Sequence, residues 1–129
     1  MMRAGLVFLA VTQGLAGLVQ LFAPEAFYTD FPWVSMLPPY NEHLMRDVGA
    51  LTLAYVLVLS VAAVTLERRL VRVALAANLV FTVPHFLFHA THLDGFSTGA
   101  VVGQTVLLGM AVLLPATLLV VSVAGQRTG

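Results

Sequence analysis

Four long runs of apolar residues, separated by short polar stretches, dominate the chain. They cover about residues 4–23, 41–66, 70–93 and 98–124, and the second run has a polar start. Each run is near the ~20 residues that a helix needs to cross the hydrocarbon core of a bilayer. Backbone groups in lipid must be satisfied within the segment, and the short alternating segments of a membrane barrel do not occur, so helices are expected. The pattern predicts an all-α fold, an integral membrane bundle of four transmembrane helices forming a single domain over residues 1–129.

Composition agrees with this class. The chain is 60% hydrophobic and 9% charged, whereas soluble domains carry about 25% charged residues. Its formal net charge is zero, so we expect no nucleic-acid partner. The expected partners are the lipid bilayer and other membrane proteins or further copies of the chain. The sequence has no cysteine, which excludes disulfides, iron–sulfur ligation and thiol nucleophiles.

Arginine placement predicts the orientation. Arg3 and the first apolar run also fit a signal peptide, but the apolar character continues to Phe22, so we expect a retained span. Five of the six arginines flank the same ends of the runs: Arg3, Arg68, Arg69, Arg72 and Arg127. The positive-inside rule then puts both termini in the cytoplasm and the 24–46 loop outside. That loop is rich in aromatic residues, so we expect it to lie along the outer interface and cap the bundle.

A polar stripe runs along the third apolar segment. Its members follow spacings of four, three, four and three residues, which places them on one helix face: Asn78, Thr82, His85, His89 and His92. Ionisable groups at membrane depth are expensive, so this face is expected to point into the bundle. Gln20 and Gln104 fall at the same outer level, and Gly99 and Gly103 form a small-residue pair suited to close helix packing.

A second polar cluster opens the preceding segment. Asn41 is a plausible helix N-cap, and Glu42, His43, Arg46 and Asp47 follow it. Opposite helix directions bring this cluster to the level of the histidines, so we expect the two clusters to meet within hydrogen-bonding reach. The alternative is that Glu42–Arg46 and His43–Asp47, each four residues apart, pair locally on their own helix.

Three interpretations of the histidine stripe remain open. His85, His89 and His92 can ligate a transition metal such as zinc, iron or copper, although one straight helix rarely supplies three ligands. The stripe can instead line a hydrogen-bonding pocket for a quinone or another apolar small molecule. It can also be a structural polar network that fixes helix packing. Bis-histidine haem fits within the first two interpretations.

Several segments resemble known membrane proteins. The segments are Phe27-Tyr28-x-x-Phe31-Pro32, Pro39-Tyr40-Asn41-Glu42-His43-Leu44-x-Arg46-Asp47-Val48-Gly49-Ala50 and Pro84-His85-x-x-x-His89-x-x-His92-Leu93. They are similar to a group of small uncharacterised bacterial four-helix membrane proteins, distantly similar in turn to the DoxX-like membrane proteins. The resemblance implies four membrane helices and a place in the bacterial plasma membrane. Some DoxX-like proteins are subunits of quinone-linked oxidoreductases, which favours the quinone interpretation and transfers no catalytic residue.

The sequence therefore predicts a ligand site in the outer half of the bundle. In this hypothesis His85 and His89 bind the ligand, Arg46 counters negative charge, and Glu42 and Asp47 orient the imidazoles. The full candidate set is Glu42, His43, Arg46, Asp47, His85, His89 and His92. The alternative function is a non-catalytic accessory or structural subunit of a larger membrane complex. Whether the protein catalyses any reaction stays open at this level.

Overall fold

The computed structural model of the protein describes residues 1–36 and 39–124. Its elements are α1 (Met2–Phe22), α2 (Pro24–Asp30), the short 3-10 helix η1 (Val34–Met36), α3 (Glu42–Thr65), α4 (Arg68–Thr91) and α5 (Thr98–Ala124). No strand occurs within these described ranges. The predicted all-α fold is confirmed, and each predicted span begins and ends within two residues of a long helix.

Side-chain caps fix where α3 and α4 begin. The Asn41 side-chain oxygen accepts the backbone N–H of Leu44 at 3.0 Å, as the predicted N-cap requires. The Glu67 carboxylate accepts the backbone N–H groups of Arg69 and Leu70 at 2.9 and 2.6 Å. These bonds satisfy donors that a helix start otherwise leaves unpaired. Because Glu67 caps α4, the two arginines after it are helical and α4 begins two residues before the predicted span.

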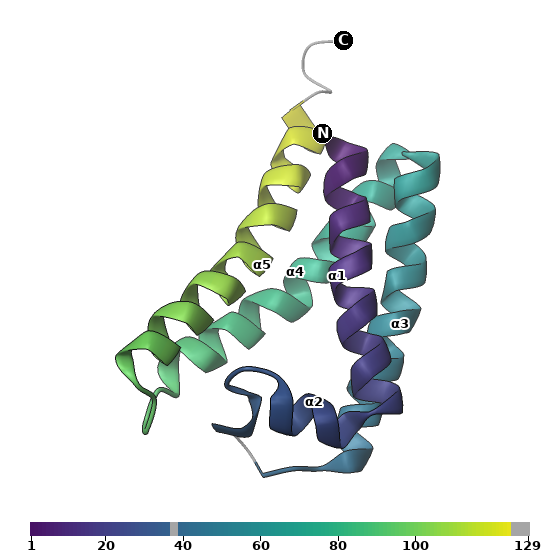
Figure 1. Ribbon diagram of the computed structural model, residues 1–129. Helices are drawn as coiled ribbons and strands as arrows, with labels where there is room; N and C mark the ends of the chain where they lie inside the picture. The colour runs from purple at the N-terminus through teal and green to yellow at the C-terminus, as the bar shows by residue number, and fades with distance from the viewer. Residues whose placement is uncertain (37–38, 125–129) are drawn as a thin grey trace.

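The long helices associate as two antiparallel pairs, α1 with α3 and α4 with α5 (Figure 1). The pairs converge at the end that holds the N-terminus and diverge toward the other end. The converging ends share a buried apolar core: Leu6, Leu9, Ala10, Leu59, Ala62, Ala63, Val71, Ala74, Leu75 and Leu118. Toward the diverging end, α1 and α3 stay in close contact through glycines. A Cβ on Gly49 would lie only 2.9 Å from the Gly17 carbonyl oxygen.

The segment between α1 and α3 is more structured than a loop. Pro24 occupies the first turn of α2, where its missing N–H costs nothing. Together, α2 and η1 lie across the opening between the two diverging helix pairs (Figure 1). Between them, Trp33 adopts a left-handed backbone conformation, with φ of 66°. Such a conformation is unfavourable for a bulky residue, so the surrounding contacts must hold it in place.

Gly103 of α5 supplies one of those contacts. A Cβ at this position would lie 2.7 Å from a carbon of the Trp33 indole, whereas a Cβ on Gly99 would meet nothing within 4 Å. The prediction that Gly99 and Gly103 form a helix-packing pair was wrong. Gly103 receives a ring from the 31–36 segment, and Gly99 faces open space.

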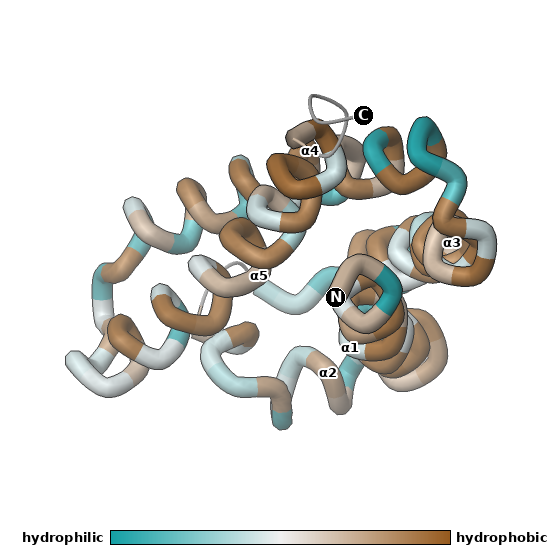
Figure 2. The backbone as a smooth tube through the Cα atoms, turned by 90° about the horizontal axis from the view of Figure 1, so that it is seen from above, coloured by the Kyte–Doolittle hydropathy of each residue, from teal (hydrophilic) through white to brown (hydrophobic). Residues whose placement is uncertain are grey.

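The outer surface of the four long helices is apolar. Leu51, Val80 and Leu113 are 72%, 77% and 66% exposed. All four helices are long and apolar enough to cross a membrane. Figure 2 shows hydrophobic residues along them and hydrophilic ones at the α3–α4 turn. These features are compatible with a multi-pass integral membrane protein whose exposed side chains contact lipid.

Candidate functional site

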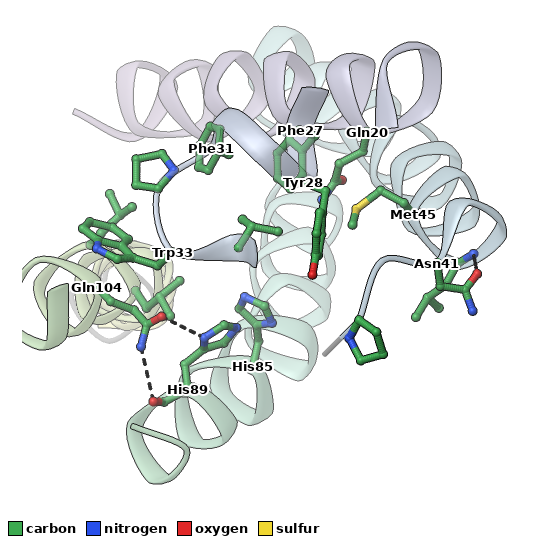
Figure 3. A pocket seen from close by; sticks show the side chains of 16 residues that line it. Gln20, Phe27, Tyr28, Phe31, Trp33, Asn41, Met45, His85, His89 and Gln104 are labelled. Carbon is green, nitrogen blue, oxygen red and sulfur yellow. Dashed lines mark hydrogen bonds between the residues drawn. The ribbon is translucent and has the colours of Figure 1, made fainter. Parts of the chain in front are cut away.

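A cavity of about 280 Å³ lies at the diverging end of the bundle (Figure 3). Every helical element and the segments around η1 contribute to its wall. The lining residues are Gln20, Phe27, Tyr28, Phe31, Pro32, Trp33, Val34, Pro39, Asn41, Leu44, Met45, His85, His89, Gln104, Leu107 and Leu108. The helix pairs separate at this end and α2 bridges them (Figure 1), and residues of α2 and of all four long helices line the cavity.

The lining of this cavity is mostly apolar, and none of the described residues in it is formally charged. Aromatic residues of α2 and the following segment line the cavity, and so do Leu107 and Leu108 of α5. Two histidines point into the same space in Figure 3, and so does the Tyr28 hydroxyl, which donates to the Ser35 carbonyl at 3.5 Å. The arrangement can hold a neutral, largely apolar molecule and offer it a few hydrogen bonds.

His89 and Gln104 form a reciprocal pair between α4 and α5. His89 Nδ1 lies 3.1 Å from Gln104 Oε1, and Gln104 Nε2 donates to the His89 backbone carbonyl at 3.4 Å. A carbonyl can only accept, so the amide nitrogen of Gln104 must face the backbone and its oxygen must face the ring. His89 Nδ1 therefore carries the proton in this bond. Gln104 is 3% exposed, so water does not compete for the contact.

His85 is placed without such a constraint. Its ring stacks on Phe81 of the preceding turn with centroids 5.3 Å apart, and it meets the edge of the His89 ring at 4.5 Å. Within residues 1–36 and 39–124, neither ring nitrogen of His85 has a hydrogen-bond partner. Its nitrogens are therefore free to serve a ligand in the cavity.

His92 does not belong to this group. Its ring stacks on Phe88 at 4.1 Å, and its Nδ1 donates to the Phe88 carbonyl at 2.9 Å. The predicted polar stripe thus divides into three parts. Asn78 and Thr82 are buried in the bundle, His85 and His89 face the cavity, and His92 lies exposed at the helix end. These residues share one helix face, but their surroundings differ because only part of α4 is packed against other helices.

The charged cluster at the start of α3 pairs within its own helix. His43 Nε2 lies 3.3 Å from an Asp47 carboxylate oxygen, and Arg46 donates to Glu42 at 2.9 Å. In the described chain no hydrogen bond or ion pair connects these four residues to His85, His89 or His92. The expected meeting of the two clusters was wrong, and the local alternative holds.

Arg46 joins α3 to the end of α1. Its guanidinium also donates to the backbone carbonyl of Leu21, in the last turn of α1. From this region, Asn41, Leu44 and Met45 line the cavity. At the start of α3, neutral residues therefore line the cavity, while the charged residues bond to each other at the surface or to the end of α1.

A transition-metal site would need further donors. Outside residues 37–38 and 125–129, no group of three or more histidine, aspartate or glutamate side chains is placed to hold an ion. His85 and His89 are adjacent, but His92 bonds to its own backbone and the carboxylates lie elsewhere. The pair alone offers fewer than the three protein ligands usual for a catalytic zinc site.

Tyr28 and Trp33 are cavity residues that the sequence did not single out as site residues. Their aromatic side chains predicted only that the 24–46 loop lies at the membrane interface. That prediction applies to the whole loop and does not single out individual residues. Gln20 and Gln104 were placed at the correct level from helix direction alone, and both line the cavity.

No family model, curated protein or solved structure matches this chain.

Proposed function

We propose that this protein binds a neutral ring-containing molecule of the quinone type, within the membrane, in the cavity at the diverging end of the bundle. The observation that carries the proposal is the combination of an uncharged aromatic wall with two adjacent imidazoles facing the same space. A quinone ring needs an apolar slot for its faces and hydrogen-bonding groups for its oxygens. The cavity offers both.

The dimensions agree with one ring. A cavity of about 280 Å³ is at the small end of the ~300–1,000 Å³ found for small-molecule pockets. Leu44 and Leu107 line it and are themselves 57% and 46% exposed. The cavity therefore opens at an apolar rim. An isoprenoid or alkyl tail can leave through this rim toward lipid while the ring stays inside.

The described residues of the lining carry no formal charge, and this restricts the ligand class. A phosphate or carboxylate would enter without a cation to meet it, at a cost of several kcal/mol in an apolar wall. Glu42, Arg46 and Asp47, which the sequence placed in the site, are engaged at the surface of α3. A neutral ligand is favoured over an anionic lipid headgroup. The distant resemblance to DoxX-like proteins stays a prediction, and it agrees with a quinone-type ligand.

Analysis of co-purified ligand tests the proposal. The protein is purified in mild detergent, and one sample is divided for metal analysis, an ultraviolet–visible spectrum and chromatography of extracted lipids. We expect a stoichiometric quinone-type molecule, lost from the His85→Leu/His89→Leu double variant. The His92→Leu variant is the matched control, because His92 lies on the same helix outside the cavity.

A ligand-free protein that does not bind added quinone and co-purifies with larger membrane proteins would contradict the proposal. It would support the accessory-subunit alternative instead. Equal ligand content in the wild type and in the double variant would place the ligand elsewhere.

A further inference from the structure

The orientation of His89 gives the cavity a defined hydrogen-bonding polarity. Gln104 Oε1 takes the proton of His89 Nδ1, at 3.1 Å, and the amide of Gln104 is itself oriented by the His89 carbonyl. A neutral imidazole has one protonated nitrogen, so Nε2 carries a lone pair. Nε2 has no hydrogen-bond partner among the described residues, and His89 lines the cavity. The fixed group that faces a ligand is therefore an acceptor.

An acceptor discriminates between the two redox forms of a quinone-type ring. The hydroquinone has hydroxyl groups that can donate to Nε2, whereas the quinone has only carbonyl oxygens. A quinone oxygen and Nε2 are both acceptors, so they cannot form a hydrogen bond with each other. Making Nε2 a donor would require His89 to change tautomer. Two acceptors, Nδ1 and Gln104 Oε1, would then face each other in a buried position.

We propose that the cavity selects the reduced, hydroxyl-bearing form of its ligand, with His89 Nε2 as the acceptor and Gln104 as the residue that sets this polarity. This inference rests on the proposed function and specifies its substrate class. His85 complements the acceptor, because its ring meets that of His89 and is not committed to either tautomer. A ligand hydroxyl that donates to His89 Nε2 can also accept a hydrogen bond from a His85 N–H. A single hydroxyl can therefore contact both rings.

The test compares three ring compounds of similar shape: tetramethyl-1,4-benzoquinone, its hydroquinone, and the dimethyl ether of that hydroquinone. The ether keeps both oxygens and cannot donate. Binding to the detergent-solubilised protein is measured by equilibrium dialysis under argon. The fluorescence of Trp33, the only tryptophan and a cavity residue, provides a second readout. We expect the hydroquinone to bind about tenfold more tightly than either other compound, since one hydrogen bond is gained and one unpaired acceptor avoided.

Two variants at position 104 connect the preference to its cause. In Gln104→Met the orienting amide is lost, and we expect the preference to fall below about threefold while hydroquinone still binds. In Gln104→Glu the preference should also fall. A carboxylate beside His89 Nδ1 favours the imidazolium, whose Nε2 is a donor and no longer an acceptor. Thermal stability in detergent establishes that both variants are folded.

The outcomes separate the two proposals. Quinone binding as tight as hydroquinone in the wild type, or a preference unchanged in Gln104→Met, would overturn the selectivity and leave the ring-binding function intact. Failure of all three compounds to bind the folded wild-type protein would overturn the proposed function and this inference together.

Discussion

The guanidinium of Arg46 in α3 donates to the backbone carbonyl of Leu21 in α1. Leu21 lies in the last turn of α1, where carbonyl groups lack partners within the helix. The contact places a positive charge at the negative end of the helix dipole. Arg46 thus joins the start of one helix to the end of its antiparallel neighbour.

The same relationship recurs at the ends of the other long helices. Arg3 of α1 donates to the Val64 carbonyl of α3 at 3.3 Å, and Arg72 of α4 donates to the Ser122 carbonyl of α5 at 2.5 Å. At the end of α4, Gln104 of α5 donates to the His89 carbonyl. A helix end near the membrane interface has less water available to satisfy its carbonyls. Partner side chains replace that water, and at α4 the same contact orients the ring of His89.

Removing the cap on α1 should destabilise the bundle without affecting the cavity. For Arg46→Met we expect a loss of about 1 kcal/mol, discounted from ~1.5–3 kcal/mol because the side chain is partly exposed. Thermal unfolding in detergent measures the loss. Glu42→Gln, which removes only the surface ion pair, should cost less than about 0.5 kcal/mol. If Arg46→Met instead keeps wild-type stability and loses ligand binding, Arg46 belongs to the binding site and its assignment as a cap is wrong.

The contact between Gly103 and Trp33 can be tested with a single methyl group. In Gly103→Ala the new Cβ would lie 2.7 Å from the indole, so the ring must move. We expect a shifted Trp33 emission maximum and a stability loss of about 1–2 kcal/mol, in the range of small-to-large changes at packed positions. Gly99→Ala on the same helix meets nothing within 4 Å and should change neither. Identical spectra for the two variants would show that Trp33 does not pack on α5.

Two substitutions at His89 separate ligand binding from scaffolding. His89→Gln keeps a group that can bond to Gln104 and should stay within about 1 kcal/mol of the wild type. His89→Leu leaves Gln104 Oε1 buried and unpaired, at a cost of about 1–3 kcal/mol. We expect both variants to lose bound quinone-type ligand, measured after purification. His92→Gln should retain it, since its ring bonds to its own helix. Full ligand content in His89→Gln would show that the ring itself is dispensable.

The Glu67 cap should make stability depend on pH. Backbone N–H groups of Arg69 and Leu70 hold the pKa of this carboxyl below its usual 4.5. A lowered folded-state pKa means that the charged cap contributes its full stability above pH 4.5. That contribution is lost as the pH falls from 4.5 through the folded-state value. Stability of wild type and Glu67→Gln, measured from neutral pH downward, should therefore differ most at neutral pH and converge in acid. A constant difference would contradict the cap.

Orientation in the membrane is testable because the chain has no cysteine. The N-terminus, the α3–α4 turn and the end of α5 lie at one end of the bundle, opposite α2 (Figure 1), and α2 contributes to the cavity lining. Arginine bias predicts that the first end is cytoplasmic. In intact cells an impermeant thiol reagent should label Ser35→Cys and spare Thr65→Cys. The opposite result would place the cavity on the cytoplasmic side.

The number, length and approximate limits of the long helices were determined by the sequence alone. Span length and apolarity are local properties, and so are the Asn41 cap and the period of the Asn78–His92 stripe. Helix direction then placed Gln20 and Gln104 at the level of the histidines, because each added residue advances a helix by a fixed rise. None of these inferences required knowledge of which helices touch.

The tertiary structure decided which polar groups share an environment. Helix direction predicted Arg46 at the level of the histidines, yet its guanidinium donates to the Leu21 carbonyl at the end of α1. The close approach of α1 and α3 at Gly17 and Gly49 brings that carbonyl within reach. The separation of the two helix pairs opened the cavity, and α2 carried Tyr28 and Phe27 into its wall. Which residues come together depends on how the helices diverge and on where their side chains point. Neither can be deduced from residue spacing along a single helix.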